Sequence, residues 1–202
     1  MPKAVLFDYD GTLLDSVEEV YRGTCNVFRK SGFLEPTFET FFETYDSSWK
    51  IFYRKHGIEI SLEKIAEWYF EVARPEECYF FNDVNDVIDI LATRGVLMGI
   101  ISAHYKDKIV DRCREIGLNK HMRTIIGRAN DKVEFILDFC REHGVNPAET
   151  YYVGDFISDV RDAKKAGVVA VGITRGKETS EILRRHGADH CISNLHELLR
   201  LL

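Results

Sequence analysis

The sequence predicts an α/β fold: a doubly wound, Rossmann-like parallel sheet with a small α-helical domain inserted near its start. Short apolar runs alternate with helical patterns along most of the chain, which is typical of β-α-β units. Between about residues 33 and 83 no strand-like run occurs, and helix-like segments rich in aromatic residues replace it. We therefore expect residues 1–14 and 84–202 to form the α/β core domain and residues 15–83 to form the helical insert.

Length and composition agree with a globular protein of this kind. The chain has 202 residues, enough for one full domain plus a small insert. Its formal net charge is −6 and no basic stripe is present, which argues against a nucleic-acid partner. The longest apolar run, 96–101, is far too short to cross a bilayer. The first residues enter a strand directly and lack the pattern of a signal peptide.

The five cysteines are scattered, and no Cys-x-x-Cys pair occurs. Neither a zinc site nor a disulfide framework is therefore indicated. Cys113 and Cys140 fall within helical patterns and are best explained as buried thiols. A reducing cytoplasm fits this cysteine usage. We expect a cytoplasmic protein that is either a monomer or a homodimer.

The chain opens with an apolar strand, 4–7, that ends at Asp8-Tyr9-Asp10-Gly11. Gly11 lets the backbone leave the strand sharply. Asp15 and Ser16 offer an N-cap for a helix whose apolar spacing continues to residue 28 and which Gly32 ends.

Aromatic residues at helical spacing mark the insert, and such a stripe is usually core. We expect a helical insert with its own core, bounded by Leu14 and the Arg74-Pro75 turn. The residues concerned are Phe38, Phe41, Phe42, Tyr45, Trp49, Phe52, Tyr53, Ile65, Trp68, Tyr69 and Phe70.

The α/β pattern resumes after the insert. The near-continuous apolar character of segment 96–102 is typical of a parallel strand covered on both faces. Further strands are expected at 123–127, 150–153, 168–173 and 189–192. Helices are expected at 84–93, 106–116, 132–143, within 154–165, at 180–186 and from 196.

Four groups of polar residues lie at, or shortly after, the carboxyl ends of predicted strands. They are Asp8 with Asp10, Ser102, Lys132, and Asp155 with Asp159. Open α/β sheets bind ligands outside these strand ends, so we expect the four groups to meet. Each group alone has a simpler explanation as a turn, a helix cap or a solvated lysine. Their agreement in order, placement and chemical type favours a common site.

This set closely resembles the haloacid dehalogenase superfamily of phosphohydrolases. The segments that match its four motifs in order are Asp8-x-Asp10-Gly11-Thr12, Ser102, Lys132 and Gly154-Asp155-x-x-x-Asp159. Two later segments look like the phosphoglycolate phosphatase branch: Asp162-Ala163-x-x-Ala166-Gly167 and Val171-Gly172-Ile173-Thr174-x-Gly176. The insert lies where that branch carries its helical cap domain.

The resemblance implies a Mg²⁺-dependent phosphatase for a small-metabolite phosphomonoester, phosphoglycolate-like or a sugar phosphate. Asp8 matches the nucleophile that forms an aspartyl-phosphate, and Asp10 the general acid and base. Ser102 and Lys132 match the groups that bind the transferring phosphoryl group. The second acid, Asp10, favours phosphate esters over haloacids.

The resemblance also implies a metal site and a specificity loop. Mg²⁺ would be held by Asp8, by the backbone carbonyl of Asp10 and by Asp155, while Asp159 would orient the metal-bound water or Lys132. Thr12 would orient Asp8 or Asp10. The residues assigned to substrate binding are Thr12, Ala103, Ser48, Trp49 and Lys50.

The cap would close over the site, with segment 45–50 placed like the family's specificity loop. The alternative, which we rank slightly ahead, is that Trp49 is insert core and Lys50 is solvated. The chain departs from the branch at Ala103-His104-Tyr105, where Asn-Lys is usual, and around Lys132, where the usual prolines are missing. We expect His104 to be a surface residue, with a substrate contact as the alternative.

Two other functions use the same residues. A sugar phosphomutase resembling β-phosphoglucomutase would have the same four groups but would protect its phospho-enzyme from water. A non-catalytic binding module could keep the fold alone, although the presence of every catalytic group argues against it.

Overall fold

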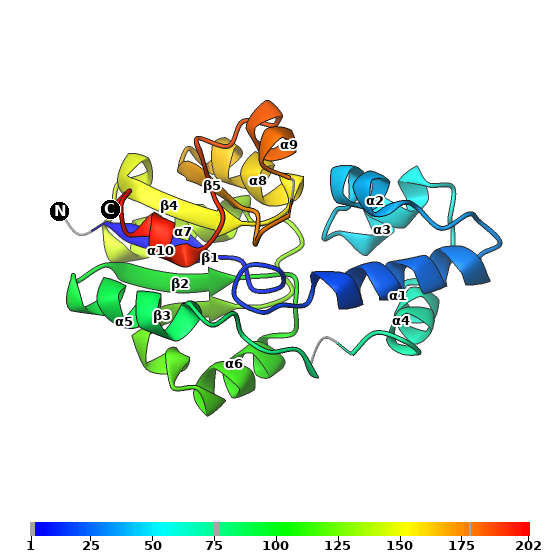
Figure 1. Ribbon diagram of the computed structural model, residues 1–202, viewed down its shortest axis with the longest axis horizontal. Helices are drawn as coiled ribbons and strands as arrows, with labels where there is room; N and C mark the ends of the chain where they lie inside the picture. Colours follow the sequence, from blue (N-terminus) through cyan, green and yellow to red (C-terminus); the bar gives the residue numbers. More distant parts are fainter. Residues whose placement is uncertain (1–2, 75–76, 178) are drawn as a thin grey trace.

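The computed structural model describes residues 3–74, 77–177 and 179–202. A six-stranded sheet with helices on both faces forms one part of the molecule, and a group of helices beside the strand tips forms the other (Figure 1). The predicted fold class is confirmed.

Every strand pair in the sheet is parallel, and the spatial order is β3-β2-β1-β4-β5-β6. Each strand begins and ends within one residue of its predicted bounds. The strands are β1 (Ala4–Phe7), β2 (Leu97–Ile101), β3 (Met122–Ile126), β4 (Thr150–Gly154), β5 (Val169–Ile173) and β6 (His190–Ile192).

The central strand β1 shows why its sequence is apolar throughout. Ala4 and Leu6 face one buried cluster, and Val5 and Phe7 face the other, so both faces of the strand are covered. The first cluster includes residues of α7 (Val133–His143), α8 (Ile157–Ala166) and α9 (Ser180–Arg185); the second includes residues of α5 (Val84–Thr93), α6 (Lys106–Glu115) and α10 (Leu195–Leu198).

The described residues of the insert include the α-helices α1 (Val17–Lys30), α2 (Phe38–Thr44), α3 (Trp49–Lys55) and α4 (Leu62–Phe70). The chain enters and leaves it by adjacent segments. Leu14 pairs with Phe80 as an antiparallel bridge, and the Asp15 N–H donates to the Tyr79 carbonyl at 2.9 Å. Of the predicted Arg74-Pro75 turn, Pro75 lies outside the described residues. No helix in the described ranges is long and apolar enough to span a bilayer.

The expectation of a separate insert core is wrong. One buried cluster runs from the insert to the sheet, and Phe156 connects the two. The Phe156 ring lies 5.6 Å from that of Phe41 and 5.3 Å from that of Phe42, measured between centroids. Phe156 is the residue before α8, so its side chain can point from the sheet toward the insert and pack on α2.

His56, at the end of α3, leads to a prediction about acid stability. Its ring packs 5.1 Å from Phe28 and 4.9 Å from Phe52, and its Nε2 has no hydrogen-bond partner among the described residues. Burial, with Lys55 adding to it, lowers the pKa of His56. The unfolded chain therefore binds more protons around its ordinary pKa of about 6.5, and stability falls as the pH drops through that value.

We expect His56→Leu to lose less unfolding free energy than the parent protein between about pH 7.5 and about pH 5.5. Urea denaturation at both pH values measures the difference. An equal loss in the two proteins would show that His56 is not held neutral in the fold.

Candidate active site

Asp8 lies at the centre of the sheet edge, where the strand order changes direction between β1 and β4. Its N–H donates to the Val153 carbonyl at 2.8 Å, and the residue is buried. The Lys132 Nζ lies 2.9 Å from Asp8 Oδ1 and 2.7 Å from Asp159 Oδ1. The Asp8 contact is an ion pair by distance, although its angle leaves Oδ1 without a hydrogen bond. The sequence motifs from three separate segments therefore meet at one point.

Burial and neighbouring charges together set the pKa values of Asp8 and Lys132. Burial raises the pKa of Asp8 to about 7, against the attraction of Lys132. Burial alone would lower the pKa of Lys132, but Asp159 and Asp8 outweigh it and hold that pKa well above its usual range. Lys132 is thus a permanent cation next to a carboxyl group that needs further positive charge to stay ionised.

Three buried carboxyl groups could hold a metal ion. Asp8, Asp155 and Asp159 each offer an oxygen, and these oxygens lie within 4.8 Å of one another. Both oxygens of Asp159 already have partners, since Oδ1 contacts Lys132 and Oδ2 accepts from the Phe156 N–H at 3.0 Å. Asp155 Oδ2 is buried without a partner among the described residues. Asp8 and Asp155 therefore fit a hard cation such as Mg²⁺, and Asp159 fits a supporting place beside Lys132.

The turn after β1 approaches Asp155 closely, and this requires glycine. Gly11 has a φ of +72°, and a Cβ there would lie 2.1 Å from Asp155 Oδ2. Thr12 is fully buried, and its hydroxyl donates to Asp155 Oδ1 at 3.3 Å, not to Asp8 or Asp10 as expected. Burial, with Asp159 and Asp8 adding to it, raises the pKa of Asp155 well above its usual range.

Asp10 is held from both sides. The Ser16 hydroxyl donates to its Oδ1 at 2.7 Å, and His104 Nδ1 lies 3.0 Å from its Oδ2. Burial would raise the pKa of Asp10, but His104 and Ser16 outweigh it and the pKa is lowered. Ser16 occupies the N-cap position of α1 as predicted, but its side chain makes no cap hydrogen bond.

The expectation that His104 is a surface residue is wrong. Its side chain is 14% exposed and contacts Asp10, because the loop after β2 folds back over the strand ends. The His104 N–H donates to Ser102 Oγ at 3.3 Å. Gly127 permits this arrangement, since a Cβ there would lie 2.3 Å from the Lys106 nitrogen and 2.6 Å from the His104 carbonyl.

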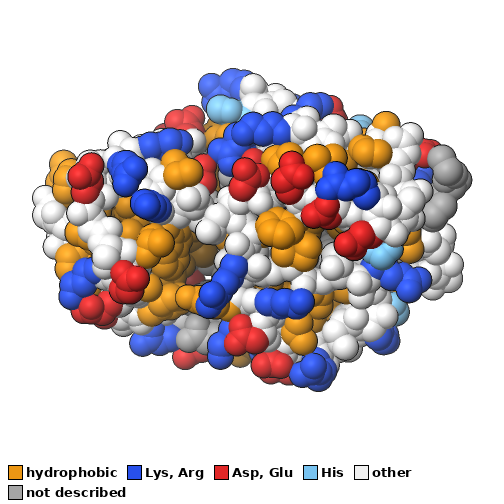
Figure 2. Space-filling view, turned by 180° about the vertical axis from the view of Figure 1, so that it is seen from behind, with side chains coloured by type: hydrophobic (Ala, Val, Ile, Leu, Met, Phe, Trp, Pro, Cys, Tyr) orange, Lys and Arg blue, Asp and Glu red, His pale blue; other side chains and the backbone are white. Residues whose placement is uncertain are grey.

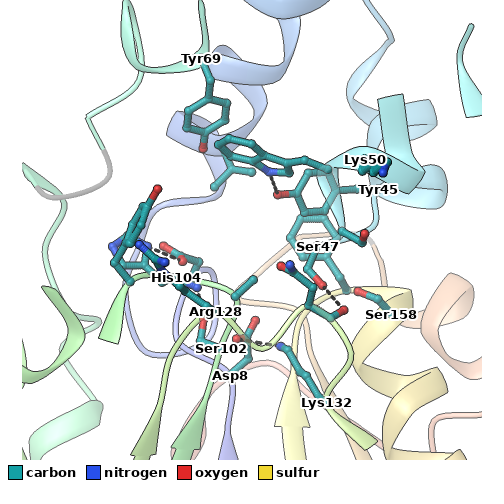
Figure 3. Close-up of a pocket in the computed structure, with 18 of the residues that line it drawn as sticks. Asp8, Tyr45, Ser47, Lys50, Tyr69, Ser102, His104, Arg128, Lys132 and Ser158 are labelled. Carbon is teal, nitrogen blue, oxygen red and sulfur yellow. Dashed lines mark hydrogen bonds and ion pairs between the residues drawn. The ribbon is translucent and has the colours of Figure 1, made fainter. Parts of the chain in front are cut away.

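A cavity of about 400 Å³ lies between the strand ends and the insert (Figure 3). It brings together most of the predicted site residues from both parts of the chain. Thr12 and Asp155 do not line it. The predicted residues that do are Asp8, Asp10, Ser48, Trp49, Lys50, Ser102, Ala103, Lys132 and Asp159.

Segment 45–50 both packs within the insert and lines the cavity, and its role as a specificity loop stays a prediction. Trp49 packs in the insert against Tyr69, with ring centroids 4.7 Å apart, and also lines the cavity. Lys50 is exposed and lines the cavity as well. Asp46 ties the segment to the core, because Arg161 of α8 contacts its Oδ2 at 2.9 Å.

Sequence reasoning missed Arg175, which supports the turn that carries Thr12 beside Asp155. Its Nη1 donates to both Asp83 oxygens, at 2.8 and 2.7 Å, and its Nε donates to the Thr12 carbonyl at 3.1 Å. The guanidinium lies 3.9 Å over the Phe81 ring, and the side chain is 5% exposed. The residue was the unspecified position in the matched segment 171–176, so the motif offered no signal for it.

The comparisons with known proteins agree with this geometry. The sequence matches the haloacid dehalogenase-like hydrolase family over residues 5–173. A Clostridium perfringens protein named as a candidate pyrophosphatase, PpaX, is 26% identical over 209 residues, covering 100% of this chain and 97% of its own. A Pseudomonas fluorescens phosphoglycolate phosphatase is 24% identical over 215 residues, covering 98% of this chain and 79% of its own.

Solved structures show the same fold. A Bacteroides fragilis protein, named as a candidate haloacid dehalogenase-like hydrolase, aligns with a TM-score of 0.78 and 26% identity, over 98% of this chain and 100% of its own. A Pseudomonas syringae hydrolase aligns with a TM-score of 0.80 and 18% identity, over 98% and 96% of the two chains.

Proposed function

The chain belongs to the haloacid dehalogenase-like hydrolase family, and we propose that it is a Mg²⁺-dependent phosphatase that hydrolyses a small phosphomonoester through an aspartyl-phosphate on Asp8. The observation that carries this proposal is the contact of Asp8 with the buried cation Lys132 at the base of a cavity. The phosphatase names of the relatives support it. In this proposal residues 1–14 and 84–202 are the catalytic core, and residues 15–83 are a cap that encloses the substrate.

The first step transfers the phosphoryl group to the protein. An Asp8 oxygen attacks phosphorus, the bond from phosphorus to the ester oxygen breaks, and Asp10, in the form of the protein in which it carries a proton, gives that proton to the leaving alkoxide. Ser16 and His104 keep the Asp10 carboxyl group in one orientation, which favours directed proton transfer.

The second step releases phosphate. Asp10, now ionised, takes a proton from a water molecule that attacks phosphorus, and the bond to Asp8 breaks. The products are inorganic phosphate and the Asp8 carboxylate, with Asp10 protonated again.

Negative charge on the phosphoryl oxygens must be balanced in both steps. Lys132 supplies a fixed cation 2.9 Å from Asp8, and Ser102, whose Oγ already accepts from His104, can donate its hydroxyl proton. Asp8, Asp155 and the Asp10 carbonyl would hold Mg²⁺, which would supply further positive charge to the phosphoryl oxygens. The five free cysteines agree with the proposed cytoplasmic setting.

Metal removal tests this function. We expect hydrolysis of p-nitrophenyl phosphate to stop in EDTA and to return with Mg²⁺, because the buried carboxyl groups lack a counter-charge without the metal. Nitrophenol and inorganic phosphate are both measured and should be released in equal amounts. Activity that persists in EDTA would contradict the metal proposal. In a separate assay with a labelled sugar phosphate as substrate, label that appears in a sugar bisphosphate, and not as free phosphate, would indicate a mutase.

A further inference from the structure

The cavity wall opposite the strand ends is mainly apolar. The insert contributes to it the apolar and aromatic side chains of Val20, Tyr45, Trp49, Leu62, Ala66, Tyr69 and Phe70, together with Ser47, Ser48 and Lys50. Few large hydrophobic residues are more than a third exposed, and three of them, Leu62, Phe70 and Tyr105 from the loop after β2, line this cavity. Figure 2 shows a hollow bordered by hydrophobic side chains with Lys and Arg side chains close by. Exposed apolar surface gathered at one cavity indicates a ligand with an apolar body.

The aromatic side chains of this wall pack on one another, and the indole N–H of Trp49 already has a partner. Trp49 lies 4.7 Å from Tyr69 and 6.2 Å from Phe70 between ring centroids, and its indole N–H donates to the Tyr45 hydroxyl at 3.4 Å. The Ser47 hydroxyl donates to the Asn130 carbonyl at 3.3 Å. The ring faces of Trp49 and Phe70 offer no hydrogen-bond partner to the hydroxyl groups of a sugar, so this part of the wall fits an apolar body better.

Arg128 places a cation at the same cavity. Its backbone adopts a positive φ of 59°, uncommon for a residue other than glycine, and its N–H donates to the His104 carbonyl at 2.8 Å. The guanidinium lies 4.7 Å over the Tyr105 ring. Among the ion pairs of the described residues, none includes Arg128. A strained backbone and a stacked cation without a carboxylate partner point to an anionic ligand group.

We propose that the substrate is a phosphomonoester whose alcohol half has a flat apolar body and carries a second anionic group. The body packs against Trp49, Tyr69 and Phe70, and the second anion binds Arg128. This inference rests on the proposed phosphatase function and narrows its substrate. A cavity of about 400 Å³ also exceeds the needs of a two-carbon ester, since pockets of about 300–1,000 Å³ enclose drug-sized ligands.

Four esters of primary alcohols test the substrate class: 4-carboxybenzyl phosphate, benzyl phosphate, glucose 6-phosphate and phosphoglycolate. Their comparable leaving groups leave binding as the main difference. We expect kcat/KM for benzyl phosphate to exceed that for glucose 6-phosphate by about tenfold, and the carboxylate to add about tenfold more.

Two pairs of variants assign the contacts. Trp49→Ala should remove most of the preference for benzyl phosphate, whereas Ile51→Ala, an exposed residue of α3 outside the cavity lining, should not. Arg128→Gln should raise KM for 4-carboxybenzyl phosphate by about tenfold and should raise KM for benzyl phosphate much less. Arg123 is an exposed arginine of β3 outside the cavity lining, and Arg123→Gln should change kcat/KM for neither benzyl phosphate nor 4-carboxybenzyl phosphate.

The outcomes separate this inference from the function on which it rests. Hydrolysis of none of the four esters with Mg²⁺ present would overturn the phosphatase function itself. A preference for glucose 6-phosphate or phosphoglycolate would leave the phosphatase in place and overturn the apolar substrate. Loss of the carboxylate gain in Lys50→Gln, but not in Arg128→Gln, would overturn the assignment of the anion site.

Discussion

Asp8→Asn is expected to lower kcat for p-nitrophenyl phosphate by at least about 10⁴-fold, the scale of loss when a covalent nucleophile is removed. The amide keeps the shape of the side chain but cannot form the acyl phosphate. It also removes one of the three acidic groups that could hold a metal. No other described carboxyl group takes this place beside Lys132, since Asp159 is already bonded on both oxygens.

Asp15→Asn is the matched control, because Asp15 is exposed and lies outside the cavity lining. It should keep the parent activity. Thermal denaturation of both variants would show that each is folded. Activity in Asp8→Asn above about one percent of the parent would mean that another group performs the attack.

Arg175→Met is expected to destabilise the fold by about 3–5 kcal/mol, because it leaves Asp83 buried without its cation. The variant also removes the donors to the Thr12 carbonyl, so the turn between β1 and α1 loses a support. Chemical denaturation gives the change in unfolding free energy.

Two further variants make this test specific. Arg185→Met removes an arginine that is 62% exposed and contacts Glu43 only at 3.9 Å, and should cost less than about 1 kcal/mol. Asp83→Asn combined with Arg175→Met should be less destabilised than the sum of the single variants, because no unpaired charge remains. A loss for Arg175→Met as small as that for Arg185→Met would contradict a structural role for the buried pair.

The sequence was informative wherever one local pattern determines the structure. Apolar runs marked the inner strands β1, β2, β4 and β5, which are covered on both faces. The edge strands β3 and β6 each carry an exposed polar residue, Arg123 and His190, and were recognised from the alternation of short strands with helices. Strand ends in a parallel sheet share one edge, and so the placement of Asp8, Ser102 and Asp155 followed from the order of the elements. The roles proposed for these residues remain predictions.

The missed features depend on contacts between segments far apart in the chain. His104 meets Asp10 across 94 residues, and Arg175 meets the Thr12 carbonyl across 163. Their orientation follows from loop paths after β2 and β5, which no periodic pattern encodes. Arg128 is similar, because its place depends on how closely the backbone at Gly127 can approach that at Lys106.

The insert shows a third reason why some features could not be predicted from the sequence. Its aromatic stripe predicted helices, but Phe156 joins its core to the sheet from a loop position that carried no hydrophobic periodicity. Ser16 likewise occupies its predicted N-cap place while its hydroxyl bonds to Asp10. In both cases a partner in the folded protein competes with the local preference.

Detection of the phospho-enzyme tests the central claim most directly. Asp10→Asn should still react with p-nitrophenyl phosphate, whose leaving group needs no proton, but should lack the base for the second step. Mass spectrometry of the acid-quenched variant should then show one phosphoryl group on the peptide that contains Asp8. The same adduct should be absent from Asp8→Asn. A phosphoryl group on another residue, or steady hydrolysis by Asp10→Asn without any adduct, would contradict the proposed mechanism.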